Sequence, residues 1–372
     1  MQTRRQNYRS DRCNSVRLDK VAAIPSNVGM LTPDSEYRRC PVTGRWVVVA
    51  PIRASRPLTL DHAAPHHRDG NHAADCPFCE GREQETPHER FALRNPGSLA
   101  NGPGWSLRVC PNKFPAVTPM QDTGHKITSV GELFEFMPGV GEHELVIECA
   151  RHEANPVRLG NDEFRDVLLA YRQRLLTHAA DPRLAYAMVF KNVGAEAGAS
   201  LAHLHSQIVA TPIVPDAIRL ELEAANDYYQ RERRCVYCDV LRQERAAKVR
   251  IVVENEWFTA ITPFAPRFAY EMWVMPNRHT SHFETISELE SLELAKFLKR
   301  ILGAMDRVLH EPAFNYFVHT GPLRANVLPY FHWHIEVIPR TSRPAGFEWG
   351  SGCFITAISP ERAAEELRAT VV

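Results

Sequence analysis

The chain has 372 residues, of which 44% are hydrophobic and 24% charged, a composition typical of a globular protein of two domains or one large duplicated unit. Its 44 basic and 44 acidic residues cancel, so we expect neither nucleic acid nor an anionic membrane as a partner. The opening segment MQTRRQNYRSDRCNSVRLDK lacks the apolar centre of a secretion signal, and no apolar run approaches the roughly 20 residues of a membrane span, so we expect a cytoplasmic protein.

The predicted elements begin after a polar, aperiodic segment at 1–35, which we expect to be a disordered tail. The β-branched run RWVVVAP at 45–51 predicts a first strand, and DHAAPHHRDGNHAAD at 61–75 predicts a solvated loop rather than a metal site. Further strands are predicted at 144–149, 184–190, 206–210, 250–253, 271–275, 314–318 and 334–338.

Two longer helices are predicted between these strands. Apolar residues recur at helical spacing over about 162–178. The second helix is predicted over 287–310, because Ser287 and Glu290 have the spacing of a capping box. A short third helix is predicted from Ser359 onward.

The order of these signals repeats along the chain. Each half has a Cys-x-x-Cys pair, a strand followed by histidine, a helix, another strand and a His-x-His pair. The local match is visible in ELVIECARH (144–152) against EMWVMPNRH (271–279). We therefore predict a duplicated module, with halves at 36–215 and 216–372, packed as one pseudo-symmetric body.

Four of the nine cysteines form the two Cys-x-x-Cys pairs, which in a reducing compartment are typical of metal sites. In the first half, Cys76 and Cys79 lie on a predicted tight turn that aims both thiolates at one point. His152 and His203 would complete a tetrahedral zinc shell. Buried or surface thiols are the alternative for an isolated pair, and the repetition of the pattern disfavours it.

The pair His203-x-His205 suggests a division of tasks. Alternate residues of a strand share a face, so these two side chains are expected to be neighbours, with Leu204 on the other face. A metal-bound imidazole is not a free nucleophile; if His203 binds zinc, His205 is the reactive residue. A neutral imidazole attacks phosphorus well when its other nitrogen donates a hydrogen bond. A structural histidine pair on a sheet face is the alternative.

Ser206 and Gln207 follow the reactive histidine directly, and the Gly-containing segment NVGAEAGAS lies at 192–200. We expect both side chains, with backbone N–H groups of that segment, to donate to phosphoryl oxygens, where charge accumulates in the transition state. Arg53 and Arg56 are candidates for binding a diphosphate, with an exposed surface position as the alternative.

The second half has FHWHIEVIPR at 331–340, with Ile335 and Glu336 in place of serine and glutamine. A carboxylate at that position would repel a phosphate, so we predict a second, structural metal here, zinc or iron. Its predicted ligands are Cys235, Cys238, His279 and His332. His319 and His334 are either further ligands or hydrogen-bonded core histidines. A nucleic-acid-binding zinc finger is disfavoured because no basic recognition helix follows.

Five segments carry a resemblance to a known family. They are YRRCPVTGRWVVVAPIRASRP (37–57), CPFCEG (76–81), VCPNKFPAV (109–117), ECARHEANP (148–156) and KNVGAEAGASLAHLHSQ (191–207). Together they resemble galactose-1-phosphate uridylyltransferase and its relatives in the histidine-triad superfamily, in the same order over about 36–357. The resemblance implies an α+β fold of two tandem histidine-triad-like halves that form one open, mainly antiparallel sheet with flanking helices. It also implies a homodimer with the active site near the subunit interface.

The resemblance further implies nucleotidylyl transfer by double displacement. His205 would attack the α-phosphorus of a nucleotide sugar and release sugar 1-phosphate, and a second phosphate would then take the nucleotide from the histidine. Gln207 would hold the α-phosphoryl group. The family's phosphate-lining positions fall on Asn192, Gly198 and Ser200, and its nucleoside-side positions on Arg53, Arg56 and Asn112. Its zinc ligands fall on Cys76, Cys79, His152 and His203.

The first hypothesis for the activity is therefore a UDP-glucose–hexose-1-phosphate uridylyltransferase of galactose metabolism, with two metals per chain. Many uridylyltransferases have His-Pro-His where this chain has His203-Leu204-His205. The second cysteine pair and AGFEWGSGCFITAISPE (345–361) resemble the branch that includes ADP-glucose phosphorylase. An adenylyltransferase of that type is the first alternative, and a noncatalytic, zinc-stabilised nucleotide-binding protein is the second.

Overall fold

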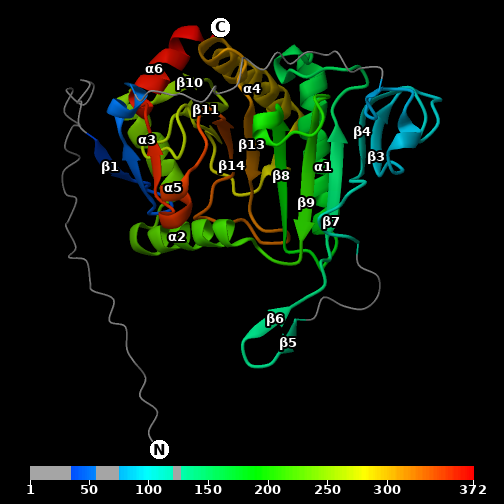
Figure 1. Ribbon diagram of the computed structural model, residues 1–372, viewed down its shortest axis with the longest axis horizontal. Coiled ribbons are helices and arrows are strands. Elements are labelled where there is room, and N and C mark those ends of the chain that lie inside the picture. The colour runs from blue at the N-terminus through cyan, green and yellow to red at the C-terminus, as the bar shows by residue number, and fades with distance from the viewer. Residues whose placement is uncertain (1–34, 56–74, 120–126) are drawn as a thin grey trace, which may run out of the picture. The chain divides into compact units, whose positions relative to one another are not determined.

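A computed structural model describes residues 35–55, 75–119 and 127–372 of the chain (Figure 1). The predicted tail at 1–35 and the predicted loop at 61–75 lie almost entirely outside these residues. Among the helices described, none is both long enough and apolar enough to cross a bilayer.

Ten strands form one large sheet, in which every neighbouring pair is antiparallel. In spatial order they are β10 (Ile251–Glu254), β11 (Phe258–Ile261), β12 (Met272–Pro276), β14 (His334–Pro339), β13 (Phe314–His319), β8 (Tyr186–Val193), β9 (His205–Thr211), β7 (Glu142–Ile147), β4 (Trp105–Pro111) and β3 (Phe91–Arg94).

The sheet is pseudo-symmetric about the pairing of β8 with β13, where Asn192 lies opposite Asn315. Moving outward from this pair, β9 corresponds to β14, β7 to β12, β4 to β11 and β3 to β10. The predicted duplication and the predicted mainly antiparallel α+β fold are therefore confirmed. Strand β8 of the first half pairs with β13 of the second half at the centre of the sheet, so residues of both halves meet there.

Helices α1 (Asn161–Ala179) and α4 (Glu288–Leu309) pack against each other and against one face of the sheet (Figure 1). Both were predicted to within two residues at each end. The α4 capping box is present, because Ser287 Oγ accepts from Glu290 N at 3.2 Å and Glu290 Oε2 accepts from Ser287 N at 2.9 Å. The third predicted helix, α6 (Pro360–Thr370), packs against α4.

The opposite face of the second half is covered by two helices that the sequence analysis did not predict, α2 (Asp216–Glu232) and α3 (Val236–Ala247). The buried side of α2 contains Glu221 between Ile218 and Ala225, so its apolar periodicity is broken by a charge. A three-stranded sheet packs into the same cluster through Val47. Its strands are β1 (Glu36–Arg39), β2 (Trp46–Val49) and β15 (Phe354–Thr356).

The remaining elements are short. A hairpin of β5 (Thr128–Val130) and β6 (Phe134–Phe136) extends from the body (Figure 1). Among the described residues the others are α5 (Gly346–Ser351) and the 3-10 turns η1 (Pro51–Ser55), η3 (Glu83–Glu85), η4 (Pro156–Arg158), η5 (Ala195–Ala197) and η6 (Phe283–Thr285).

Candidate functional site

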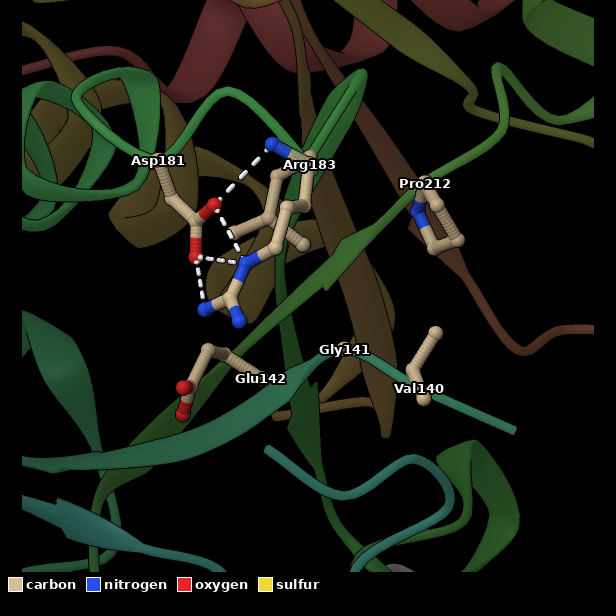
Figure 2. Close-up of a pocket in the computed structure, with 7 residues that line it drawn as sticks. Val140, Gly141, Glu142, Asp181, Arg183 and Pro212 are labelled. Atoms are coloured by element: carbon tan, nitrogen blue, oxygen red, sulfur yellow. Dashed lines mark hydrogen bonds and ion pairs between the residues drawn. The ribbon is translucent and has the colours of Figure 1, made fainter. Parts of the chain in front are cut away.

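Strand β9 has a small pocket at its end and the predicted reactive residues at its beginning. Figure 2 shows the pocket, in which Arg183 and Asp181 pair with each other, with Nη2 and Oδ2 2.6 Å apart. The pocket is lined by Val140, Gly141, Glu142, Asp181, Arg183, Leu184 and Pro212. None of these is a predicted site residue.

The direction of side chains on β9 follows its pairing in the sheet. Ile208 belongs to the core beneath α1, as does Leu204 just before the strand. His205 comes directly after Leu204, so its side chain points to the opposite face of the sheet, away from α1. On that face it lies beside Ile147, its partner on β7. His203 precedes the first residue of β9, although it was predicted to lie in the strand. Its ring is nevertheless on the same side as His205, because the Phe78 ring contacts both, with centroid distances of 6.1 and 5.2 Å.

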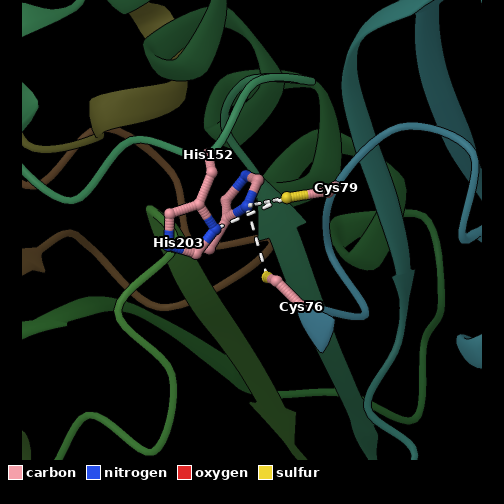
Figure 3. A group of neighbouring side chains, drawn as sticks. All are labelled: Cys76, Cys79, His152 and His203. Carbon is pink, nitrogen blue, oxygen red and sulfur yellow. Dashed lines mark hydrogen bonds between the residues drawn. The ribbon is translucent and has the colours of Figure 1, made fainter. Parts of the chain in front are cut away.

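Cys76, Cys79, His152 and His203 meet at one point (Figure 3). Cys79 Sγ lies 3.4 Å from His152 Nδ1 and 3.6 Å from His203 Nδ1, and Cys76 Sγ lies 3.5 Å from His203 Nδ1. Zinc bonds of ordinary length at tetrahedral angles would put sulfur and nitrogen about 3.6 Å apart. The donor set and its spacing therefore fit zinc.

The other nitrogen of His203 is also fixed. Nε2 lies 2.8 Å from the carbonyl oxygen of Cys149 and donates to it, which leaves the Nδ1 lone pair facing the cysteines. Burial lowers the pKa of His203 to about 4, so the ring is neutral at pH 7, as a metal ligand must be.

His205 has the geometry of a free nucleophile. Its Nδ1 lies 2.8 Å from the carbonyl oxygen of His203 and must donate to it, so Nε2 carries the lone pair. Burial lowers the pKa of His205, which keeps the imidazole neutral. Phe78, between the two cysteines, packs edge-on against the ring at an interplanar angle of 65°. The metal loop thus holds the nucleophile in place.

Gln207 lies two residues further along the same face and is part of a hydrogen-bonded cluster. Its Oε1 is 2.8 Å from His143 Nε2, on the neighbouring strand β7. Asn112 follows β4 and reaches the same nitrogen, with its Nδ2 at 3.1 Å. The structure therefore brings the predicted residues Gln207 and Asn112 to one ring, that of His143, which the sequence analysis missed.

Asn192, Gly198 and Ser200 lie on or after β8, the other neighbour of β9. Lys191 pairs with Ser206, so the next residue, Asn192, is beside His205. Gly198 has φ +85°, a conformation that favours glycine, and a Cβ there would lie 3.9 Å from Asn192 Nδ2. Ser200 is exposed in the loop that leads to β9.

The two arginines are not brought to this cluster by the described residues. Arg53 is exposed on η1, after β2, which packs with the second half. Arg56 lies outside the described residues. A role in substrate binding stays a prediction for both.

The expectation that the Ser206 side chain faces a phosphoryl group is wrong. Ser206 is fully buried on the α1 side of β9, and its hydroxyl bonds to Glu148 and to the hydroxyl of Tyr171. Glu148 in turn pairs with Lys191 at 2.5 Å. Neighbouring residues of a strand point to opposite faces, so Ser206 cannot share a ligand with His205 and Gln207.

The second half repeats the metal geometry. Cys235, Cys238, His279 and His332 meet at one point. Cys238 Sγ lies 3.4 Å from His279 Nδ1 and 3.6 Å from His332 Nδ1, and His332 Nε2 lies 2.9 Å from the carbonyl oxygen of Pro276. The separations again fit a tetrahedral ion with thiolate and imidazole ligands.

His334 is the counterpart of His205, but a carboxylate lies against the ring nitrogen that would be the nucleophile. Its Nδ1 lies 3.0 Å from the His332 carbonyl oxygen, but its Nε2 lies 3.4 Å from Glu221 of α2. His319 Nδ1 contacts the same carboxylate at 2.7 Å. Burial alone would raise the pKa of Glu221, and the two imidazoles lower it to about 2. Glu221, His319 and His334 thus form a third, fully buried group with donors suited to iron or zinc, separate from the second set.

Comparison with known proteins agrees with this architecture. Residues 30–215 match the galactose-1-phosphate uridyl transferase N-terminal domain, and residues 162–372 match a domain of unknown function, DUF4921. ADP-glucose phosphorylase of Arabidopsis thaliana is 35% identical over 340 residues, which cover 90% of this chain and 92% of that protein. Galactose-1-phosphate uridylyltransferase of Thermotoga maritima is 28% identical over 345 residues, which cover 91% and 99%.

The solved structures agree as well. The crystal structure of the Arabidopsis thaliana ADP-glucose phosphorylase with bound ADP-glucose superposes with a TM-score of 0.78 and 33% identity, over 91% of this chain and 100% of that one. A uridylyltransferase structure gives 0.69 and 26%, over 90% and 98%. With its duplicated sheet, its two Cys2His2 groups and these relatives, the chain belongs to the galactose-1-phosphate uridylyltransferase family.

Proposed function

We propose that this protein transfers a nucleotidyl group through a covalent bond to His205. The His205 Nε2 lone pair attacks the α-phosphorus of a nucleotide sugar, and the bond from that phosphorus to the bridging oxygen breaks, releasing sugar 1-phosphate. A phosphate oxygen of the acceptor then attacks the same phosphorus and frees Nε2. The observation that carries the proposal is the 2.8 Å contact from His205 Nδ1 to the His203 carbonyl oxygen, which leaves Nε2 as the nucleophile and supports the positive charge on the ring.

We propose that the amides of Gln207 and Asn192 stabilise the negative charge on the α-phosphoryl oxygens during both steps. Zinc held by Cys76, Cys79, His152 and His203 would serve as a structural ion that fixes the loop carrying Phe78 and the backbone before His205. The second half, whose corresponding histidine is enclosed by Glu221, would have no nucleophile.

We propose ADP-glucose as the nucleotide donor and inorganic phosphate as the acceptor, which gives glucose 1-phosphate and ADP. The support is the identity of 35% to an ADP-glucose phosphorylase and the TM-score of 0.78 to its complex with ADP-glucose, both above the values for the uridylyltransferases compared. The second cysteine pair of this chain is the sequence feature that favours the same branch.

Uridylyl transfer between UDP-glucose and hexose 1-phosphate, the first hypothesis from the sequence, is the second candidate. The observation in its favour is the match of residues 30–215 to the uridyl transferase domain model. The site geometry is the same for both donors, because the covalent step involves only the α-phosphorus.

The test is to incubate the protein with ADP-glucose or UDP-glucose labelled at the α-phosphate and to measure protein-bound label. We expect acid-labile, base-stable label from ADP-glucose in the absence of phosphate, and none in His205→Asn, which keeps an N–H donor near the position of Nδ1 but has no atom at Nε2. Label from UDP-glucose alone would replace the first candidate by the second. No label from either donor would contradict the enzyme proposal and favour a noncatalytic nucleotide-binding protein.

The homodimer implied by the family resemblance stays a prediction. Light scattering coupled to size-exclusion chromatography would test it, with a mass near twice the 42.2 kDa of one chain as the expected result. A single-chain mass would contradict it.

A further inference from the structure

The proposed mechanism needs N–H groups beside His205, but an amide side chain can present either its N–H groups or its oxygen. Gln207 and Asn192 flank His205 on the same face of the sheet. The end of each amide that faces a phosphate is decided by whatever bonds to the other end. The groups behind the two amides therefore matter for the chemistry.

Behind Gln207 lies His143 of β7, a buried residue. The backbone N–H of Ala116 points at His143 Nδ1 at 3.0 Å, and a backbone N–H can only donate. Nδ1 therefore holds a lone pair, and the neutral ring carries its proton on Nε2. That N–H faces the Gln207 side chain at 2.8 Å, so the Gln207 oxygen must be on this side and its NH2 group on the other.

The contact of Asn112 with the same ring does not change this assignment. Its Oδ1 accepts from the backbone N–H of Phe114 at 2.9 Å, so its Nδ2 is the atom 3.1 Å from His143 Nε2. With Nε2 protonated, the amide nitrogen meets no lone pair there. A ring that accepted at both nitrogens would carry no proton, so the Ala116 contact at Nδ1 leaves Nε2 as the donor.

Behind Asn192 lies Asn315 of β13, which belongs to the second half. Arg340 Nε donates to one end of the Asn315 amide, and a guanidinium can only donate, so that end is the oxygen. The Asn315 Nδ2 then donates to the carbonyl oxygen of Ala197 at 2.8 Å and to Asn192 Oδ1 at 2.7 Å. Because its oxygen is held in this way, Asn192 turns its NH2 group towards Gly198.

On the basis of the proposed function, we propose that His143 and Asn315 are positioning residues for nucleotidyl transfer. Each holds the oxygen of one amide, so that the N–H groups of Gln207 and Asn192 face the α-phosphoryl group at His205. Asn315 lies where β13 pairs with β8 at the centre of the sheet. Through it the second half of the chain contributes a positioning residue to the active site of the first.

The role of His143 is tested by two substitutions, each of which replaces a different ring nitrogen with an amide. His143→Asn puts its amide where Nδ1 was and can still accept from Ala116, but it offers no donor to Gln207. His143→Gln brings an N–H donor to the place of Nε2. We expect His143→Asn to slow single-turnover labelling of the protein by about 100-fold, with KM little changed, and His143→Gln to recover most of the rate. Equal losses in both variants, or a rate loss that follows a fall in Tm, would overturn the proposal.

The Asn315 arm uses Asn315→Asp, which keeps an acceptor for Arg340 but removes the donor to Asn192. We expect the labelling rate to fall by about 10-fold or more, again with KM little changed. Combined with Asn192→Ala the substitution should add no further loss, because the two act through one amide. Combined with Gln207→Ala it should add its full loss. Losses that add in both backgrounds would show a merely structural role.

A measurement independent of turnover separates this proposal from the proposed function. In protein carrying 15N-labelled histidine, the His143 signal, assigned by its absence in His143→Gln, should report a protonated Nε2 and an unprotonated Nδ1. The opposite tautomer would overturn the positioning role even in an active enzyme. Absence of label from any nucleotide sugar would instead contradict the proposed function, and the tautomer would still decide how Gln207 is oriented.

Discussion

The ring of His205 is held by the backbone of His203, whose carbonyl oxygen accepts from His205 Nδ1 at 2.8 Å. His334 has the same contact with His332, at 3.0 Å. The two halves therefore present the same tautomer at corresponding positions. They differ at the other nitrogen, because Nε2 of His334 lies 3.4 Å from the Glu221 carboxylate.

A first prediction concerns the atom and the stoichiometry of the covalent bond. We expect one nucleotidyl group per chain, attached to Nε2 of His205, because Nδ1 is occupied by its proton and the backbone carbonyl. Mass spectrometry of the labelled protein gives the stoichiometry and the residue, and 31P–15N coupling in protein with 15N-labelled histidine identifies the nitrogen. Attachment at Nδ1, or any label on His334, would contradict the assignment.

A second prediction concerns the two Cys2His2 groups. Cys76→Ser should remove one metal and with it most of the labelling activity, because His203 then loses its fixed place before β9. Cys235→Ser should remove a different metal and leave the first in place, because the two ligand sets share no residue. Metal analysis by plasma mass spectrometry measures both. Loss of both metals in either variant, or of neither, would refute two independent sites.

A third prediction contrasts Ser206 with Gln207, its neighbour on the opposite face. Ser206→Ala removes one hydrogen bond each from the buried Glu148 and Tyr171, so the free energy of unfolding should fall by about 1–3 kcal/mol. The labelling rate at a temperature where the variant is folded should stay near that of the original protein. Gln207→Ala should show the reverse, a slow rate with stability nearly unchanged. Urea titration gives the free energy of unfolding, and single-turnover labelling gives the rate. A slow labelling rate in Ser206→Ala would show that the serine takes part in the reaction after all.

A fourth prediction concerns Glu221. Its carboxylate contacts two buried imidazoles, so Glu221→Gln should lower the free energy of unfolding by about 3 kcal/mol. Glu223 is a matched control on the same helix, because it is exposed and pairs with Arg219, an exposed residue one turn away. Glu223→Gln should change stability by less than about 0.5 kcal/mol. Equal midpoints for the two variants in urea would show that the third group contributes nothing to folding.

The duplicated architecture and the two sets of candidate metal ligands follow from patterns that are visible in the sequence. The duplication was readable because two Cys-x-x-Cys pairs, two strand-plus-histidine segments and two His-x-His pairs recur in one order. The helices α1 and α4 were predicted from apolar spacing, which is a local property of the chain. The two sets of cysteine and histidine followed from the preferences of zinc, which are chemical and independent of the fold.

The environment of those residues depends on contacts between distant parts of the chain. Which way Ser206 points, that Glu221 closes off His334, and that His143 and Asn315 hold the amides beside His205 all depend on which strands and helices are neighbours. The physical reason is the distance along the sequence over which each effect acts. Helical periodicity and ligand chemistry act over a few residues of sequence, whereas the orientation of an amide is set by a donor that pairing of distant strands brings within 3 Å.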